Sequence, residues 1–210
     1  MHVLFREKHG LDETAIPIDL KQEPADLVFL SYSDSDLNSF AEGWRRGYRS
    51  SKKNFISLRL ANIETLRHPL SVDTYVTNTL SKSKGILIRL IGGVPYWEYG
   101  LEQIQKISKK NNIPLAILPA DGRNDERLDN FSNLPISTLR QLSELCNQGG
   151  PTASQAALAQ MALAAGLYAL PVIGEKKIPQ YGFWEPNKIL HTLPQNIESL
   201  KKSKLVIIIF

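Results

Sequence analysis

The chain has 210 residues, of which 42% are hydrophobic and 22% charged, so it is long enough to bury a core. Its formal net charge is +4, but the lysines stand in scattered pairs and form no stripe, which argues against a nucleic-acid-binding surface. A single cysteine, Cys146, excludes a disulfide framework and a cysteine zinc cage and is typical of a reducing compartment. No apolar run approaches the roughly 18 residues of a membrane span, and no signal-peptide pattern is visible, so we expect a cytoplasmic protein without membrane or nucleic-acid partners.

Short apolar runs alternate with longer amphipathic stretches along residues 1–122. Strands are expected at Met1–Phe5, Asp26–Ser31, Phe55–Leu60, Gly85–Ile91 and Ile113–Leu118. Helices are expected at Leu37–Tyr48, Pro69–Leu80 and Tyr96–Lys109. Ser35, just before the first of these helices, is a candidate N-cap. Strands that alternate with helices over short connections are typical of a mostly parallel sheet, so we predict a flavodoxin- or Rossmann-like α/β head at 1–122.

The pattern changes after residue 122. Pro135–Gln148 and Thr152–Tyr168 are helical in pattern with no strand between them, so residues 123–170 are expected to form a helical segment. Residues 171–203 mix Pro, Gly and single aromatic residues and are expected to form an extended linker. Lys204–Phe210 (KLVIIIF) has the composition of a buried strand. We expect it to be the first strand of a truncated following domain; the alternative is a strand of the first sheet.

Several side chains with useful chemistry follow the predicted strands, where open parallel sheets bind ligands. Gly92 and Gly93 allow a tight turn or a close approach of backbone to a ligand. Tyr96 and Trp97 come next, and they fit either the core or a flat face for a planar ring. His68 precedes a proline, and a lone histidine there is more often a packed loop residue than a catalytic group.

Two arginines lie inside apolar strands, where an unpaired cation is costly. Arg59 and Arg89 therefore need acidic partners, either within the protein or on a ligand. The run from Ser33 to Asp36 is more typical of a helix start than of a metal site, because two carboxylates without a third ligand bind metal poorly. The sequence also lacks the phosphate loop, H-E-x-x-H, G-x-S-x-G and CxxC motifs, so no known loop for ATP hydrolysis is present.

Four segments of the chain, with two motifs in order, carry a specific resemblance to one family. The segments are Pro24–Leu37, Ser57–Leu80, Ile86–Ile104 and Leu115–Pro135, and the motifs are LRLANxxxLRHPLSVDxY and LxGGxxYWxYG. Over roughly residues 1–150 the chain resembles the N-terminal region of CobN-type cobaltochelatase large subunits. It departs from that family at Ala120, where a glycine is expected, at Asn124-Asp125-Glu126, and in lacking most of the family's length.

The resemblance implies a role in the ATP-dependent insertion of Co²⁺ into hydrogenobyrinic acid a,c-diamide, during aerobic cobalamin synthesis. Cobalt would be a substrate, ATP would be hydrolysed by partner subunits that include an AAA+ ATPase, and the isolated chain is expected to be inactive and to hold no cofactor. Alternatives are a docking head for the ATPase subunits, a relative of the magnesium chelatase large subunit, and, last, a flavin or nucleotide module. No catalytic residue or metal ligand is expected in this chain. The expected corrinoid-binding residues are Arg59, Arg67, His68, Arg89, Gly92, Gly93, Tyr96 and Trp97.

Overall fold

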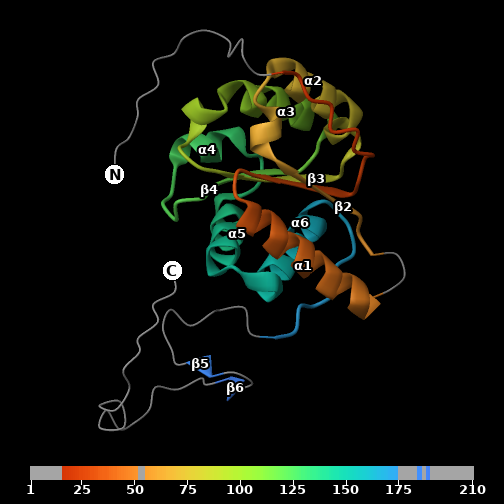
Figure 1. The fold of residues 1–210 in the computed structure, drawn as a ribbon, viewed down its shortest axis with the longest axis vertical. Helices are drawn as coiled ribbons and strands as arrows, with labels where there is room; N and C mark the ends of the chain where they lie inside the picture. The colour runs from red at the N-terminus through yellow and green to blue at the C-terminus, as the bar shows by residue number, and fades with distance from the viewer. Residues whose placement is uncertain (1–15, 52–54, 175–183, 186–187, 190–210) are drawn as a thin grey trace. The chain divides into compact units, whose positions relative to one another are not determined.

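The computed structural model describes residues 16–51, 55–174, 184–185 and 188–189, and its main sheet is all-parallel. Its four strands lie in the order β2-β1-β3-β4, which is the start of a flavodoxin-like order (Figure 1). The predicted α/β class is therefore confirmed. The strands are β1 (Leu27–Ser31), β2 (Leu58–Asn62), β3 (Gly85–Leu90) and β4 (Leu115–Pro119).

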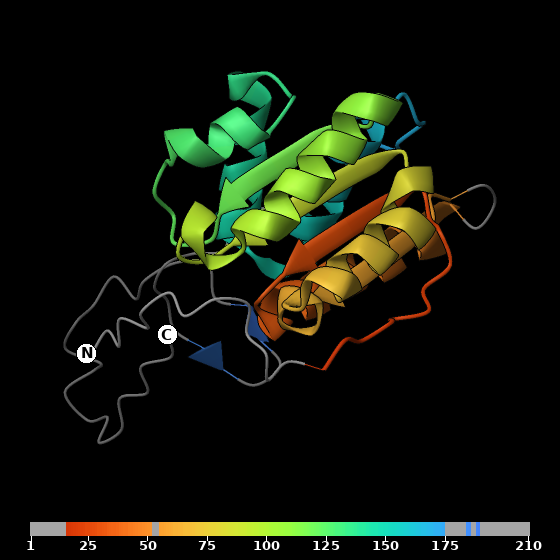
Figure 2. The same cartoon turned by 90° about the horizontal axis from the view of Figure 1, so that it is seen from above.

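Helices cover both faces of this sheet, as both views show (Figures 1 and 2). One face carries α1 (Asp34–Ser51), α5 (Ile136–Gln148) and α6 (Gly150–Ala164). The other carries α2 (Pro69–Asn78), α3 (Glu98–Asn111) and α4 (Glu126–Phe131). Three short 3-10 turns are η1 (Ile63–Leu66), η2 (Leu80–Lys82) and η3 (Val94–Tyr96). Within the described ranges, no helix is long and apolar enough to cross a membrane.

The central strands form because most of their residues face an apolar layer, whereas Ser31 and Arg89 form hydrogen bonds with Asp36. Successive side chains of a strand point to opposite faces, so Val28 and Leu30 enter the core under α2 and α3, while Leu27 and Phe29 enter the core under α1 and α6. All five residues of β1 are buried, and the ring of Phe29 stacks on that of Phe40 with 3.7 Å between centroids.

The helical segment expected at 123–170 packs onto this same sheet. Leu139 and Leu142 of α5 and Leu158 and Met161 of α6 belong to the same buried cluster as Phe29. The structure therefore does not divide the chain at residue 122, because the sheet needs these helices to cover its second face. The first compact unit extends to residue 177, and residues 178–210 form a separate one, in which β5 (Trp184–Glu185) and β6 (Lys188–Ile189) pair antiparallel. The predicted strands Met1–Phe5 and Lys204–Phe210, and most of the predicted linker, lie outside the described residues.

Several local boundaries differ from the predictions, among them those of the strand predicted at 55–60 and the helix predicted at 37–48. The strand predicted at 55–60 begins at Leu58 and runs to Asn62. The first helix begins at Asp34, and its cap is Ser33, whose Oγ accepts a hydrogen bond from the N–H of Asp36 at 3.3 Å. The N-cap predicted at Ser35 is wrong because that residue already lies inside the first turn.

Polar side chains satisfy backbone groups at both borders of the sheet. On the β4 border, Asn133 Oδ1 accepts from the N–H of Leu115 at 2.7 Å, and Ser132 Oγ accepts from the strand N–H two residues further on at 2.9 Å. On the β2 border, Gln22 Nε2 donates to the carbonyl of Leu60 at 2.9 Å. Side chains from neighbouring segments thus take the place of further strands at these positions.

Candidate functional site

The loops that follow the four strands lie at one end of the sheet, because the strands are parallel and in register. We call this end the carboxyl edge; it comprises the loops that begin after Ser31, Asn62, Leu90 and Pro119. The structure places five of the eight predicted site residues in these loops and leaves them at least partly accessible; they are Arg67, His68, Gly92, Gly93 and Tyr96. The other three make hydrogen bonds within the protein; Arg89 and Trp97 are buried, and Arg59 is half-buried.

Arg89 is held within the protein through its two terminal guanidinium nitrogens, while its buried Nε has no hydrogen-bond partner among the described residues. It stands near the end of β3, is only 6% exposed, and donates to Asp36 Oδ1 at 2.8 Å and to Asn147 Oδ1 at 2.7 Å. The hydroxyl of Ser31 donates to the second oxygen of Asp36 at 2.9 Å. The acidic partner that we predicted for Arg89 is therefore Asp36, a residue of α1. This network fills the point between β1 and β3 where flavodoxin-like sheets reverse their strand order, so Arg89 does not face a ligand.

Arg59 is also removed from the site. It is the second residue of β2, away from the carboxyl edge, and its Nε donates to the carbonyl of Glu23 at 2.8 Å. A second hydrogen bond joins its guanidinium to the carbonyl of Leu58 at 3.2 Å. Backbone carbonyls, not the predicted carboxylate, satisfy this cation, and they tie β2 to the extended segment that precedes β1.

Trp97 belongs to the core. It is 5% exposed, and its indole Nε1 donates to the carbonyl of Leu66 at 3.0 Å. Its ring lies against Gly100, where an added Cβ would come within 2.2 Å of the ring. The side chain therefore ties the loop after β3 to η1 after β2, and it offers no face to a ligand.

Arg67 and His68 follow η1 at the carboxyl edge. His68 caps α2, because its Nδ1 accepts from the N–H of Leu70 at 3.1 Å. Arg67 is exposed and pairs with Glu64 at 2.9 Å. An exposed pair of this kind contributes little to stability.

The two glycines after β3 have the turn role predicted for them. Gly92 and Gly93 have φ angles of 82° and 74°, a region that favours glycine. A Cβ on Gly92 would come within 2.3 Å of the ring of Tyr96, so the tyrosine lies directly over this glycine. The ring is nevertheless 65% exposed, which leaves an aromatic surface at the carboxyl edge. The hydroxyl of Tyr32 donates to the carbonyl of Tyr96 at 3.4 Å, and burial raises the pKa of Tyr32 to about 12.

A polar groove runs between the loops after β3 and β4. We call it the β3–β4 groove; it has a volume of about 630 Å³ and is open to solvent. Buried apolar residues and both glycines form part of its lining, and charged residues from the loop after β4 and from α4 form the rest. The lining consists of Leu90, Gly92, Gly93, Pro119, Asp121, Arg123, Asn124, Asp125, Glu126, Arg127 and Leu128.

Sequence reasoning did not predict this groove, because it did not predict α4. The available signal was Asp125, a good N-cap residue, three positions before the apolar Leu128. In the structure, Asp125 Oδ1 accepts from the N–H of Arg127 at 2.9 Å and so begins α4. Two charged side chains of this helix, Glu126 and Arg127, line the groove.

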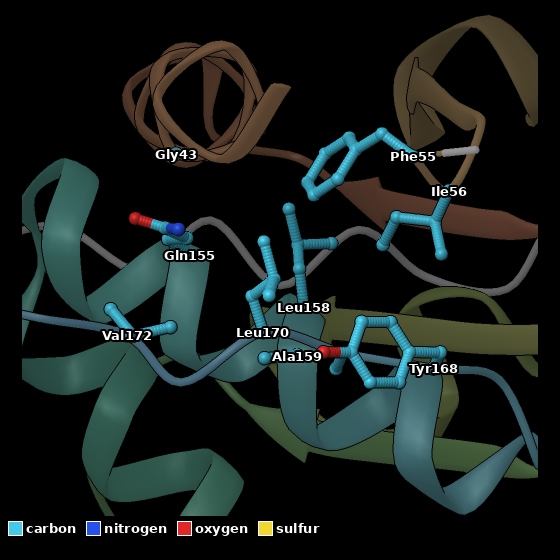
Figure 3. A pocket seen from close by; sticks show the side chains of 10 residues that line it. Gly43, Phe55, Ile56, Gln155, Leu158, Ala159, Tyr168, Leu170 and Val172 are labelled. Atoms are coloured by element: carbon cyan, nitrogen blue, oxygen red, sulfur yellow. The ribbon is translucent and has the colours of Figure 1, made fainter. Parts of the chain in front are cut away.

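A second hollow lies between α1, α6 and residues 168–172 (Figure 3). Its volume of about 20 Å³ is roughly that of one water molecule, and its lining is mostly apolar, with Phe55, Ile56 and Leu158 among the lining residues. We regard it as a packing gap. Among the described residues, no group of three or more His, Cys, Asp or Glu side chains is placed to hold a metal ion.

Fold and site together define a flavodoxin-like parallel α/β domain with a polar groove at the carboxyl ends of its strands. No family model matches the chain. Over 150 residues it is 35% identical to the aerobic cobaltochelatase subunit CobN of a Sinorhizobium species, which is 71% of this chain and 11% of the relative. The same identity and length hold for CobN of Pseudomonas aeruginosa, of which 12% is covered. The matched residues therefore belong to the CobN family, and the resemblance found in the sequence is confirmed.

A solved structure shares the fold. The catalytic subunit of cobaltochelatase from Mycobacterium tuberculosis superposes with a TM-score of 0.52 at 24% identity, over 76% of this chain and 12% of that one. The chain thus spans about a ninth of the length of the curated relatives it matches.

Proposed function

We propose that this chain is the N-terminal part of a cytoplasmic cobaltochelatase large subunit. The intact subunit would insert Co²⁺ into hydrogenobyrinic acid a,c-diamide, while partner subunits, one of them an AAA+ ATPase, hydrolyse ATP. The observation that carries this proposal is the 35% identity to two CobN subunits over 150 residues. Because the chain spans about a ninth of these relatives, we propose that it is inactive alone and contributes contacts to the chelatase.

The proposed contribution is contact with the corrinoid at the carboxyl edge. Tyr96 supplies an exposed aromatic face, and Arg67 supplies a guanidinium in a weak surface pair. Gly92 leaves room for the ring of Tyr96, Gly93 adds no side chain to the turn, and His68 stands between Arg67 and α2. Arg59, Arg89 and Trp97 are no longer part of this proposal, because hydrogen bonds within the protein hold their side chains.

A titration of the purified chain with metal-free hydrogenobyrinic acid a,c-diamide tests this contribution. We expect saturable changes in corrinoid absorbance and in tryptophan fluorescence, weakened by Tyr96→Ala. The matched control is Tyr168→Ala, which removes an exposed tyrosine that follows α6 on the opposite layer of the domain. Absence of binding by a folded sample would refute a corrinoid contact in this part of the subunit.

A second candidate role is docking of the ATPase subunits. The carboxyl edge and the first turns of α2 and α3 carry exposed apolar and aromatic side chains, as protein interfaces commonly do; these are Leu70, Ile91, Tyr96 and Tyr99. The test measures binding of the purified ATPase subunits to the chain. Docking is favoured over corrinoid contact if the ATPase subunits bind, if Leu70→Asp together with Ile91→Asp abolishes this binding, and if the chain does not bind the corrinoid.

A further inference from the structure

We propose that the C-terminal half of α1 and the segment after α6 form a docking surface for an acidic segment of a partner protein. We call this surface the arginine–tyrosine face; it comprises Arg45, Tyr48, Arg49, Tyr168 and Ile173. It lies away from the carboxyl edge, because a helix that joins two parallel strands runs back from the carboxyl end of the first to the amino end of the second. Docking at this face therefore does not depend on the proposed corrinoid contact.

The positive charge of this face comes from arginines. From Glu42 to its end at Ser51, α1 carries three arginines and one carboxylate, which gives this half of the helix a formal charge of +2. Arg49 is exposed in the last turn. Arg45 is 58% exposed and pairs with Glu42, and an exposed pair of this kind costs little to break. Arginine is enriched at protein interfaces, where its planar guanidinium binds a carboxylate with two parallel hydrogen bonds.

The third arginine of this half of α1 has a structural role. Nε of Arg46 donates to Gln155 Oε1 of α6 at 2.9 Å, and its Nη2 donates to the carbonyl of Ile173. These hydrogen bonds hold the segment after α6 against α1. Arg46 thereby builds the arginine–tyrosine face, while Arg45 and Arg49 present their charges to a partner.

Exposed aromatic and apolar side chains lie beside these cations. Tyr48 is 46% exposed, stacks on Trp44 with 5.2 Å between ring centroids, and meets Phe55 edge-on at 6.4 Å. Phe55 and Tyr168 line the same hollow between α1 and α6 (Figure 3). Tyr168 and Ile173 are 79% and 82% exposed. Large apolar side chains that gather on one exposed surface indicate an interaction site.

This combination fits a peptide that carries both carboxylates and apolar side chains. Clusters of arginine recognise acidic motifs, and exposed tyrosine rings give apolar side chains a surface to pack on. A membrane would instead require apolar side chains to enter the lipid. The rings of Trp44 and Tyr48 pack on each other, and α1 turns its apolar Phe40 to the sheet, where it stacks on Phe29. An acidic protein segment is therefore the occupant that the face favours.

The test measures binding of the full chain to a fluorescein-labelled peptide of glutamates interspersed with leucines, by fluorescence anisotropy. We expect saturable binding that weakens as the salt concentration rises, because salt screens exposed charges. Arg45→Gln with Arg49→Gln should weaken this binding about tenfold, through the loss of two charge-assisted contacts. Tyr168→Ser should weaken it about threefold, because the leucines lose an aromatic ring to pack on.

Two control variants separate this face from the overall charge of the chain. Lys109→Gln with Lys110→Gln also removes two positive charges, but at the end of α3 in the opposite layer of the domain, and should leave the affinity unchanged. Arg45→Lys with Arg49→Lys keeps both charges but loses the guanidinium geometry, so its affinity should lie between those of the unsubstituted chain and the glutamine variant. Circular dichroism checks that each variant is folded.

Three results would each overturn the proposal. They are absence of peptide binding by the folded chain, an equal loss of affinity in the lysine control, and binding to phosphatidylserine vesicles without binding to the peptide. A parallel titration with hydrogenobyrinic acid a,c-diamide separates the proposal from the corrinoid contact. The variant with glutamine at both arginine positions should bind the corrinoid as the unsubstituted chain does, so either interaction can fail while the other stands.

Discussion

Replacement of Arg89 by methionine tests whether this residue is structural. Methionine keeps most of the volume but removes the donors to Asp36 and Asn147, and it leaves the Asp36 carboxylate, 18% exposed, with the hydroxyl of Ser31 as its remaining side-chain donor. Removing one partner of a buried ion pair costs about 3–5 kcal/mol. Because Asp36 keeps Ser31 and some solvent, we expect the lower end, about 3 kcal/mol.

Urea unfolding followed by circular dichroism measures this loss. For a domain of this size, a loss of about 3 kcal/mol corresponds to a fall of about 6–12 °C in Tm. The control is Arg45→Met, which breaks an exposed pair with Glu42 in α1 and should change the free energy of unfolding by less than about 0.5 kcal/mol.

A second substitution shows whether the lost ion pair is the cause. Asp36→Asn combined with Arg89→Met removes both charges, so the double variant should be more stable than the sum of the two single losses predicts. A loss below about 1 kcal/mol for Arg89→Met, or strict additivity of the two changes, would refute the assignment. Corrinoid affinity per folded molecule should not change, because Arg89 does not reach the carboxyl-edge surface.

Three further predictions concern stability and reactivity. Gly92→Ala should cost about 1–2 kcal/mol in urea unfolding, because its φ is left-handed and its Cβ would displace Tyr96; a neutral result would mean that the loop is free to rearrange. Burial raises the pKa of the Cys146 thiol to about 12, so a thiol reagent at pH 8 should modify it slowly in the folded protein and rapidly in urea; fast reaction before unfolding would contradict this burial. Burial alone would raise the pKa of Asp26, but hydrogen bonds, among them one from the N–H of Ser57, lower it. Ionised Asp26 therefore stabilises the fold above its unfolded pKa of about 3.9, and this contribution is lost as the pH falls through the lower folded value. Asp26→Asn should accordingly be less stable at pH 7 by about 1.5–3 kcal/mol, with a difference that shrinks in acid; a constant difference would exclude ionisation as the cause.

The sequence predicted best those elements whose pattern is set by full burial. The strand predicted at 85–91 ends one residue from its observed end, because all of its residues are apolar or enclosed. The edge strand β2 was misplaced by three residues at its start, since Phe55 and Ile56 are apolar for another reason: they pack against α1, where Trp44 Nε1 donates to the carbonyl of Ile56. α4 was missed because it has only six residues, most of them polar, which is too short for a helical spacing of apolar residues to be recognised.

The prediction of the site was limited by contacts between residues that lie far apart in the sequence. The pattern placed Gly92 and Gly93 correctly in a turn at the carboxyl edge, since that inference needs only the strand before them. It did not reveal that Arg89 meets Asp36, 53 residues away, or that Trp97 meets the carbonyl of Leu66, 31 residues away. An arginine inside a strand has the same local signature whether its partner is in the protein or on a ligand, so only the fold distinguishes the two.

The polar side chains at the two borders of the sheet have a consequence for assembly. Free backbone groups at the border of a sheet can form hydrogen bonds with a strand from another sheet, so that the two sheets join. Here Asn133 and Ser132 occupy one border and Gln22 occupies the other. At these positions the border groups are already occupied, which disfavours the addition of a further strand there. Asn133→Ala would release the N–H of Leu115 and open a border to unintended self-association.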